Sequence, residues 1–430
     1  MIRRLYLFDD AVARSWRPFA LTRPVGELLF GALLLRSRIE RATGLAVEGY
    51  LGPAELHGFE EPGAPPVLPP PADHGSAGRI LLLSRYVPPL SQGGGTAPSL
   101  SFPSDLPPEG VRLVADGSPV GWMLPDSASL PSPHDLRHPE SAPPEGVERP
   151  REVELPGTLL PDPWTLMAEN AGRTHMDLEL LFPGGAGPGA GPLPELDGVR
   201  RLGPHPVSAA DDVEVEPEVV LDTREGPIHL GPGVRVHAFT RLRGPAFIGP
   251  DSVLLGGTLE RLSCGPVCKL HGEISGSVVN GYCNKAHHGY LGHAVLGRWV
   301  NLGAMTTNSD LKNTYGTVRV PAPSGQGEVD SGLLKAGILL GDHVKTGIGT
   351  LMNTGSVVGA GSNLFGGEMP PRDVPPFSWG NGSRLTVYRR ASFLTTAERV
   401  MQRRDVDLSP AMHTLLARVW DGVHGQEEDQ

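Results

Sequence analysis

The sequence predicts an α/β domain followed by a parallel β-helix, and three observations lead to that fold class. A beat of six residues, mostly apolar, runs through the second half, at Leu230, Val236, Leu242, Ile248 and Leu254 and again at Leu340, Thr346, Met352, Val358 and Leu364. Glycines follow many of these positions. Three such beats per turn are typical of a β-helix with a triangular cross-section, whose stacked coils share one core. Before about residue 200, short apolar runs and helical spacing replace the beat.

Composition bounds the class of protein. A chain of 430 residues exceeds one ordinary core, so we expect domains at 1–205 and 206–384 and a helical tail at 385–430. A formal net charge of −11 argues against nucleic acid or an anionic membrane surface as the main partner. The apolar run at the start is too short for a signal segment, and no run is long enough to span a membrane. We therefore expect a cytoplasmic protein.

The three cysteines fit that compartment. Cys264, Cys268 and Cys283 make no disulfide framework, and the first two lack a second pair with which to bind zinc. Thiols that have no structural partner in the sequence are typical of a reducing environment.

The first strand is expected over Arg4–Phe8, an apolar run that ends in Asp9 and Asp10. Open α/β sheets bind ligands at the carboxyl ends of their strands, so these two carboxylates are candidate nucleotide-binding and metal-binding residues. The alternative is a solvated strand end.

A helix is expected over Val25–Ile39, with Gly44 as its stop. Its N-terminus would lie beside Arg17 and Arg23, which we predict to form an anion cradle for a nucleotide. The alternative is a pair of salt bridges from these arginines to the two aspartates.

The rest of the first domain is less regular. A second strand is expected over Arg79–Leu83 and a pair of helices over Asp162–Leu181. Between Glu61 and Pro150 the Pro-rich segments have no period, and we interpret them as long surface loops. The sequence has no P-loop, and the start of the chain lacks a Gly-rich phosphate loop.

The β-helix is expected from about Glu214 to Gly367, with a loop extruded around Pro321–Asp330. A Pro-rich exit then leads into two helical patterns over 391–424, the second capped at Ser409 before Pro410. Helices in this place can cover the open edge of the last coil.

The stretch from Gly272 to Gly316 combines the repeat with polar residues suited to chemistry. Its histidines leave two further interpretations open. His288 and His293, with His271, have a spacing that is similar to the zinc site of γ-class carbonic anhydrases, formed between subunits. The histidines could also be structural, and Tyr290 and Trp299 could be packing residues.

The residues of this stretch carry a resemblance. Ala286-His287, Tyr290-Leu291-Gly292, Asn301-Leu302-Gly303-Ala304, Asn308 and Lys312 resemble the acetyltransferase half of the bifunctional GlmU enzymes, which make UDP-N-acetylglucosamine from glucosamine-1-phosphate, acetyl-CoA and UTP. With LFDD, LTRPVGEL and PWTLMAEN, most of the chain is similar to a GlmU-like variant family of sugar nucleotidyl transferases.

The resemblance implies roles for individual residues. His287 matches the catalytic base, which takes a proton from the sugar amine as its nitrogen attacks the thioester. Glu273 matches the carboxylate that orients this base. The substrate-binding positions would be Lys285, Tyr290, Asn301, Asn308 and Lys312. Ser275 and Gly276 stand where the family has paired lysines beside the sugar phosphate, so either the substrate differs from glucosamine-1-phosphate or Lys285 takes over that contact.

The resemblance also implies a nucleotidylyltransferase-like first domain, a left-handed β-helix, Mg²⁺ held by carboxylates, and a homotrimer. Its partners would be a sugar phosphate, a nucleoside triphosphate and acetyl-CoA. The predicted activity is N-acetylation of an amino-sugar-1-phosphate coupled to nucleotidylyl transfer. The alternatives are an acyltransferase with a non-catalytic first domain, a scaffold that lost both reactions, and a γ-anhydrase-like metal hydratase.

Overall fold

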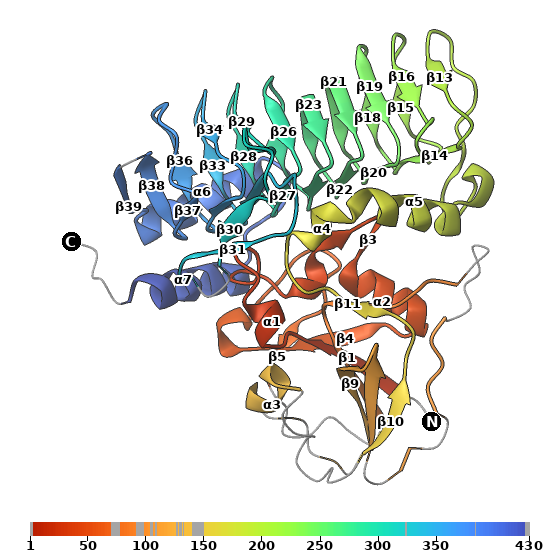
Figure 1. Ribbon diagram of the computed structural model, residues 1–430, viewed down its shortest axis with the longest axis vertical. Helices are drawn as coiled ribbons and strands as arrows, with labels where there is room; N and C mark the ends of the chain where they lie inside the picture. Colours follow the sequence, from red (N-terminus) through yellow and green to blue (C-terminus); the bar gives the residue numbers. More distant parts are fainter. Residues whose placement is uncertain are drawn as a thin grey trace.

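The structure is a computed structural model that describes residues 3–69, 78–91, 99–103, 106–107, 110–125, 128, 131, 133–139, 150–322, 325–382 and 384–425. An α/β domain lies against one face of a long parallel β-solenoid, and the C-terminal helices return to the α/β domain (Figure 1). No helix among these residues is long and apolar enough to cross a membrane.

The sheet of the first domain is built around β1 (Arg3–Phe8), which pairs in parallel with both of its neighbours. Within the described residues the strand order is β10-β8-β9-β6-β1-β4-β5, with β9 antiparallel to β6 and β8. The strands predicted over Arg4–Phe8 and Arg79–Leu83 are therefore confirmed. The other bounds are β4 Val47–Leu51, β5 Val67–Leu68, β6 Gly78–Leu83, β8 Val111–Ala115, β9 Ser118–Leu124 and β10 Arg151–Glu154.

The helix predicted over Val25–Ile39 is wrong in its first half. A single 3-10 turn η1 (Val25–Glu27) leads into the small hairpin β2 (Leu29–Phe30) and β3 (Leu33–Leu34), and α2 (Leu35–Thr43) begins only then. Gly31 in the hairpin has φ +70°, a left-handed conformation that suits glycine and that a continuous helix cannot contain. The predicted stop at Gly44 is confirmed, since it caps α2.

The other connections follow the chain closely. The predicted helix pair is confirmed as α4 (Thr165–Ala168) and α5 (Asn170–Leu181). Part of the Pro-rich stretch between residues 61 and 150 is structured, because β8 and β9 form a hairpin around Asp116-Gly117, while other parts lie outside the described residues. Shorter elements are α1 Ala11–Arg14, η2 Ala54–Leu56, β7 Tyr86–Val87, α3 Pro133–Arg137, β11 Thr158–Leu159 and η3 Pro183–Gly185.

The second half is a parallel solenoid of the left-handed β-helix type, as predicted. Its inward side chains stack into one core, in which Leu242, Leu259, Ile274 and Leu291 are almost fully buried. The face toward the first domain is made, among the residues described, by β12 Gly191–Pro192, β14 Val207–Ala209, β17 Ile228–Leu230, β20 Ala246–Ile248, β22 Ser263–Cys264, β24 Val278–Val279, β27 Val295–Leu296, β32 Ile338–Leu340, β35 Ser356–Val358 and β37 Asp373–Val374.

The other two faces share one large sheet. Its members are β13 Arg200–Leu202, β15 Glu214–Val215, β16 Val220–Asp222, β18 Arg235–Val236, β19 Thr240–Arg243, β21 Val253–Glu260, β23 Lys269–Ser275, β25 Asn284–Lys285, β26 Tyr290–Gly292, β28 Asn301–Leu302, β33 Lys345–Thr346, β36 Asn363–Leu364, β38 Ser378–Asn381 and β39 Arg384–Val387. The ladder thus starts at β12 and β13, somewhat before residue 206, and ends at the antiparallel pair β38–β39. Separate pairs are β29 (Thr307–Asn308) with β34 (Leu351–Met352), and β30 (Arg319–Pro321) with β31 (Glu328–Asp330).

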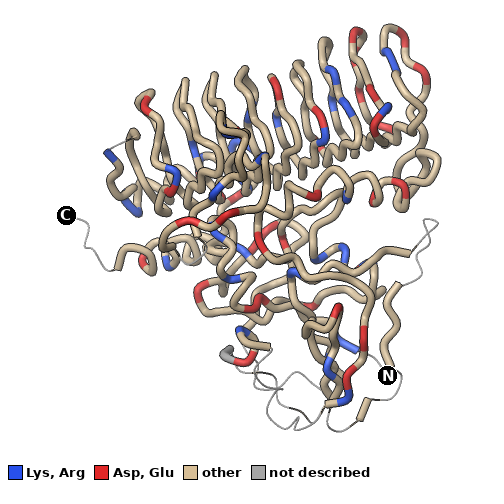
Figure 2. The backbone as a smooth tube through the Cα atoms, in the orientation of Figure 1, with Lys and Arg blue, Asp and Glu red and all other residues tan. Residues whose placement is uncertain are grey.

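The hairpin β30–β31 is the extruded loop that the sequence predicts. On the first coils, acidic and basic residues interleave (Figure 2), and Asp222 accepts from Arg224 and Arg241 at 2.7 Å each. These charges neutralise one another across neighbouring coils.

The tail forms α6 (Arg390–Gln402) and α7 (Pro410–His424), with Ser409 as the predicted cap of α7. These helices cover the last coil and also complete the core of the first domain. Phe393, Leu415 and Trp420 lie in the same hydrophobic cluster as Leu7 and Leu56. The tail therefore packs against both the last coil of the solenoid and the first domain.

Candidate active site

Lys285 stands where an aliphatic residue would fill the solenoid core. It lies opposite the buried Leu270 in the ladder and is only 1% exposed. Its Nζ donates to the backbone oxygen of His271 at 3.2 Å and to that of His287. Burial lowers the pKa of Lys285 to about 8. The lysine predicted to bind substrate thus lies beneath the corner that carries the histidines and holds their backbone.

His287 protrudes from this corner, between β25 and β26, and is exposed to solvent. Glu273, also exposed, lies on the preceding coil, where it pairs in register with Tyr290. Gly272 beside it is so close that an added Cβ would lie 3.3 Å from the His287 backbone oxygen. The predicted base and its predicted orienting carboxylate therefore share one corner of the solenoid, on neighbouring coils.

Tyr290 and His293 meet at Asp310, a residue that our sequence analysis did not single out. The Tyr290 hydroxyl donates to Asp310 Oδ2 at 2.8 Å, and His293 Nδ1 lies 2.7 Å from the same oxygen. Burial raises the pKa of Asp310, but the bonds from His293 and Tyr290 outweigh burial, so the net shift is downward. An imidazole held by a carboxylate in this way is oriented for proton transfer.

The three histidines of the predicted metal alternative do not converge within one chain. His271 Nε2 and His288 Nε2 are 3.5 Å apart, whereas His293 is turned to Asp310. His288 is exposed, like its neighbour His287.

Asn301 lies in a basic cleft between the solenoid and α6. The cleft has a volume of about 470 Å³, and its charged lining consists of Lys269, Lys345, Arg403 and Arg404, with no acidic residue. Asn284 donates to Asn301 at 2.9 Å, and both line the cleft. Nearby, Tyr282 stacks on Trp299 with ring centroids 4.2 Å apart. This chemistry suits a phosphate-bearing ligand with polar groups.

Asn308 and Lys312 bond the chain to itself. Asn308 exchanges two hydrogen bonds with the backbone of Gly292, each 3.0 Å long, and is 2% exposed. Lys312 donates to the Thr317 backbone oxygen at 3.0 Å. Both residues thus fix the coil next to Tyr290, and the geometry favours a positioning role over direct contact with substrate.

The two aspartates after β1 are buried and paired. Asp10 caps α1 by accepting from the Ala13 N–H at 2.8 Å, and both of its oxygens accept from Arg85. Asp9 accepts from the Val25 N–H at 3.1 Å and lies 3.6 Å from Arg14, while burial raises its pKa. Asp10 is thus occupied by Arg85, whereas Asp9 Oδ1 is buried and has no hydrogen-bond partner in the part of the chain described, so only Asp9 offers a free oxygen to Mg²⁺ and the metal site at Asp9 and Asp10 stays a prediction.

Arg17 and Arg23 reach across to the solenoid instead of forming an anion cradle. Arg17 pairs with Asp373 at 2.8 Å. Arg23 is 1% exposed and is bound by Glu61 and Asp342, each at 2.8 Å. The alternative of structural salt bridges is therefore favoured, but with partners other than Asp9 and Asp10.

Other arginines line the opening beside the end of β1. A cavity of about 520 Å³ has Arg14, Arg137 and Arg418 in its lining, with Glu55 as its acidic member. A smaller cavity next to it is lined by Asp9, Arg14 and Arg137. There was little reason in the sequence to single out these arginines, because they are far apart along the chain and only the fold brings them together.

The architecture is that of an N-terminal α/β domain joined to a parallel β-helix. Residues 5–184 match the family model described as sugar nucleotidyl transferase. The predicted family resemblance is confirmed by curated relatives at modest identity. The bifunctional protein GlmU of Bartonella quintana is 28% identical over 210 residues, 45% of this chain and 41% of that protein.

A second relative is the bifunctional sugar-1-phosphate nucleotidylyltransferase/acetyltransferase of Sulfurisphaera tokodaii, 27% identical over 166 residues, 38% of this chain and 39% of that protein. The matches thus span about two fifths of the length of these relatives. Among solved structures, the Arabidopsis UDP-N-acetylglucosamine acyltransferase is 13% identical, with a TM-score of 0.19, over 55% of this chain and 95% of that one.

Proposed function

We propose that this protein is a transferase of nucleotide-sugar synthesis, in which the solenoid moves an acyl group from coenzyme A to the amine of a sugar phosphate. The single observation that carries the proposal is the corner at 286–290, where the exposed His287 stands on a backbone held by Lys285 and Glu273 lies on the neighbouring coil. The names of the curated relatives support the reaction class.

In the proposed reaction, His287 takes the proton from the sugar nitrogen while that nitrogen forms a bond to the thioester carbonyl carbon. The carbon–sulfur bond then breaks, and the imidazolium returns the proton to the departing thiolate. Glu273 stabilises the imidazolium. The basic cleft at Asn301 and Arg403 would bind phosphate groups of the acyl acceptor or of coenzyme A.

His293 is a second candidate for the base. Its bond to Asp310 fixes its orientation, whereas no residue of the described part of the chain holds the His287 ring in this way. Activity of His287→Ala close to wild type, together with a large loss in His293→Ala, would assign the role to His293.

The first domain is proposed to bind the nucleotide at the cavity beside β1, where Arg14 and Arg137 supply positive charge. Because Asp9 and Asp10 are already paired, an acyltransferase with a non-catalytic nucleotide-binding domain is a second candidate function.

Product analysis tests the proposed function and the second candidate function together. The chain is incubated with acetyl-CoA, a panel of amino-sugar-1-phosphates and each nucleoside triphosphate, with and without Mg²⁺, and the products are identified by mass spectrometry. An acetylated sugar phosphate supports the acyltransferase, and a nucleotide sugar adds the second activity. An acetylated product without any nucleotide sugar favours the second candidate, and no product with any pair contradicts the proposal.

A homotrimer is part of the proposal. Exposed apolar side chains follow the same solenoid corner as His287: Phe239 is 77% exposed, Met305 54% and Ile348 78%. Apolar rows of this kind mark surfaces that bind another protein, here a second copy of the chain. Sedimentation should give three times 45.6 kDa, and Ile348→Lys should shift the species toward monomers. A wild type that sediments only at 45.6 kDa would contradict this assembly.

A further inference from the structure

Three metal-ligating side chains meet where α5 crosses the first coils of the solenoid. His175 and Glu179, four residues apart on one face of α5, place Nε2 and Oε1 3.0 Å from each other. His205, from the loop between β13 and β14, has its ring centroid 5.1 Å from that of His175. The ligand atoms of all three residues lie within 4.8 Å of one another.

The scaffold that brings them together is rigid. His205 stands between Pro204 and Pro206, which restrict the backbone on both sides of it. Gly203 before them has φ +103°, and a Cβ there would lie 2.4 Å from the Arg224 backbone nitrogen. The loop therefore packs tightly against the next coil.

Helix α5 is equally fixed. The hydroxyl groups of Thr174 and Ser263 are 2.8 Å apart, both fully buried, and Asn170 donates to the Arg261 backbone oxygen at 3.3 Å. On the other side, the buried Asp177 pairs with Arg38. The distance between the helix and the coil is thus set by contacts that do not involve the three ligands.

From this geometry we propose that His175, Glu179 and His205 bind a divalent transition metal of the zinc class. Two imidazole nitrogens and one carboxylate oxygen are a donor set that zinc takes, with water in the fourth position. Ligands at about 2.0–2.1 Å in a tetrahedron lie roughly 3.3 Å apart. The atoms, now within 4.8 Å of one another, would close by at most about 1.5 Å around the ion through rotation of the side chains.

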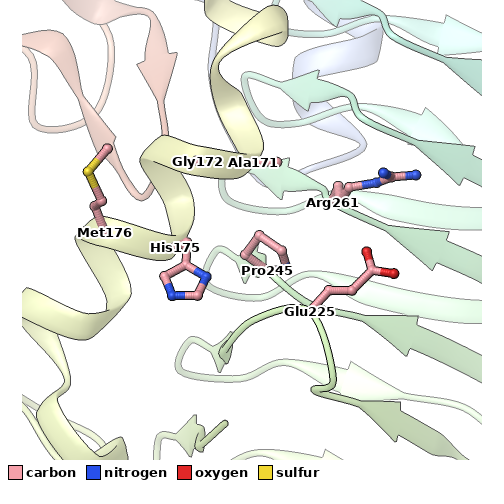
Figure 3. A pocket seen from close by; sticks show the side chains of 7 residues that line it. All are labelled: Ala171, Gly172, His175, Met176, Glu225, Pro245 and Arg261. Atoms are coloured by element: carbon pink, nitrogen blue, oxygen red, sulfur yellow. The ribbon is translucent and has the colours of Figure 1, made fainter. Parts of the chain in front are cut away.

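A cavity of about 410 Å³ adjoins His175, one of the three proposed ligands. It is lined by His175, Met176, Glu225, Pro245 and Arg261, and Figure 3 shows His175 and Met176 extending from α5 while Pro245, Glu225 and Arg261 come from the solenoid. The metal would join the last helix of the first domain to the first coil of the solenoid, independently of the proposed transferase function.

The alternative is a simple ion pair between His175 and Glu179, and metal titration separates the two. The full chain is stripped with chelator, and Zn²⁺ and Co²⁺ are titrated while calorimetry records the stoichiometry and the visible spectrum reports Co²⁺ geometry. His205→Ala and Glu179→Gln are compared with His237→Ala, a matched control, because His237 pairs with Glu216 at 3.5 Å on the same solenoid.

We expect wild type and His237→Ala to bind one equivalent that both His205→Ala and Glu179→Gln bind at least about tenfold more weakly. Zn²⁺ should also raise the melting temperature of wild type and not of His205→Ala. Circular dichroism and sedimentation of the metal-free variants confirm that they are folded. Equal stoichiometry and affinity in wild type and His205→Ala would overturn the proposal.

Discussion

His287 and His288 are neighbours in sequence, yet only one is proposed to transfer protons. General-base catalysis contributes roughly 10²- to 10⁴-fold, so His287→Ala should lower acetyl transfer by about that factor and leave the affinity for acetyl-CoA nearly unchanged. His288→Ala, whose ring faces His271, should cost less than about tenfold. Steady-state rates of the two variants check this, and the reverse ranking would move the base by one residue.

Lys345 provides a test by pH. Burial lowers its pKa to about 7, below the ordinary value of about 10.4. Between these values the unfolded chain binds more protons than the folded one, so this residue's contribution to stability rises with pH from about 7 to about 10. As the pH rises across this range, the free energy of unfolding of wild type should therefore increase relative to that of Lys345→Met. A difference that does not change with pH would contradict the lowered pKa.

Several contacts between residues could have been predicted from the sequence if the number of residues in each turn of the solenoid had been known. Pairs such as His293 with Asp310, Asn284 with Asn301, and His271 with His288 are all 17 residues apart, which is one turn of the solenoid here. The six-residue beat indicates the fold but not this local coil length. The position of Lys285 in the core was hidden for the same reason.

Among the elements, α6 has an expected role that its sequence did not suggest. Arg403 and Arg404, just after its last turn, face the Asn301 cleft, and a charge-assisted hydrogen bond is worth about 1.5–3 kcal/mol. Arg403→Glu should therefore raise the KM for a phosphate-bearing substrate by about tenfold or more, with kcat almost unchanged. Kinetics at low and moderate salt concentrations measure this change in KM.

Arg399→Glu is the control, because it makes the same charge change on the exposed side of α6, outside the lining of the cleft. If both substitutions raise KM equally, the effect comes from the overall field and the cleft is not a phosphate site.

The type of an element was predicted correctly where the apolar pattern lies within the element itself. It was missed where a turn determines the structure. The strands β1 and β6 and the helix α5 follow from their own residues. The hairpin β8–β9 was missed although Asp116-Gly117 between two apolar runs is a turn signal, because the Pro-rich segments around it dominated the interpretation. The hairpin β2–β3 replaced a predicted helix, since apolar spacing alone does not distinguish the two in so short a run.

At the scale of the whole molecule, a buried ionic network joins the two domains. Asp342 accepts from Arg23 Nε at 2.8 Å and from Thr22 at 2.7 Å, and Glu61 binds both Arg23 and Arg298. Asp342→Asn should destabilise the protein by about 3–5 kcal/mol, because it leaves a buried guanidinium with one carboxylate partner fewer. Chemical denaturation measures the loss.

The Arg17–Asp373 pair crosses the same interface but is about one third exposed. Asp373→Asn should therefore cost no more than about 1 kcal/mol. Equal effects of the two substitutions would show that burial of the network adds nothing. Neither contact was predictable, because Arg23 and Asp342 are 319 residues apart and nothing in the local sequence relates them.

The return of the C-terminal helices to the first domain affects how the protein is made on the ribosome. Arg418 of α7 donates to the backbone oxygen of Ala54, 364 residues earlier, and α7 completes the hydrophobic cluster around Leu56 and Phe59. At about 5–20 residues per second, roughly 20–70 seconds separate the synthesis of the two segments. The first domain must wait through this time with an apolar surface uncovered, so a nascent chain of this protein is expected to depend on chaperones until its last helix emerges.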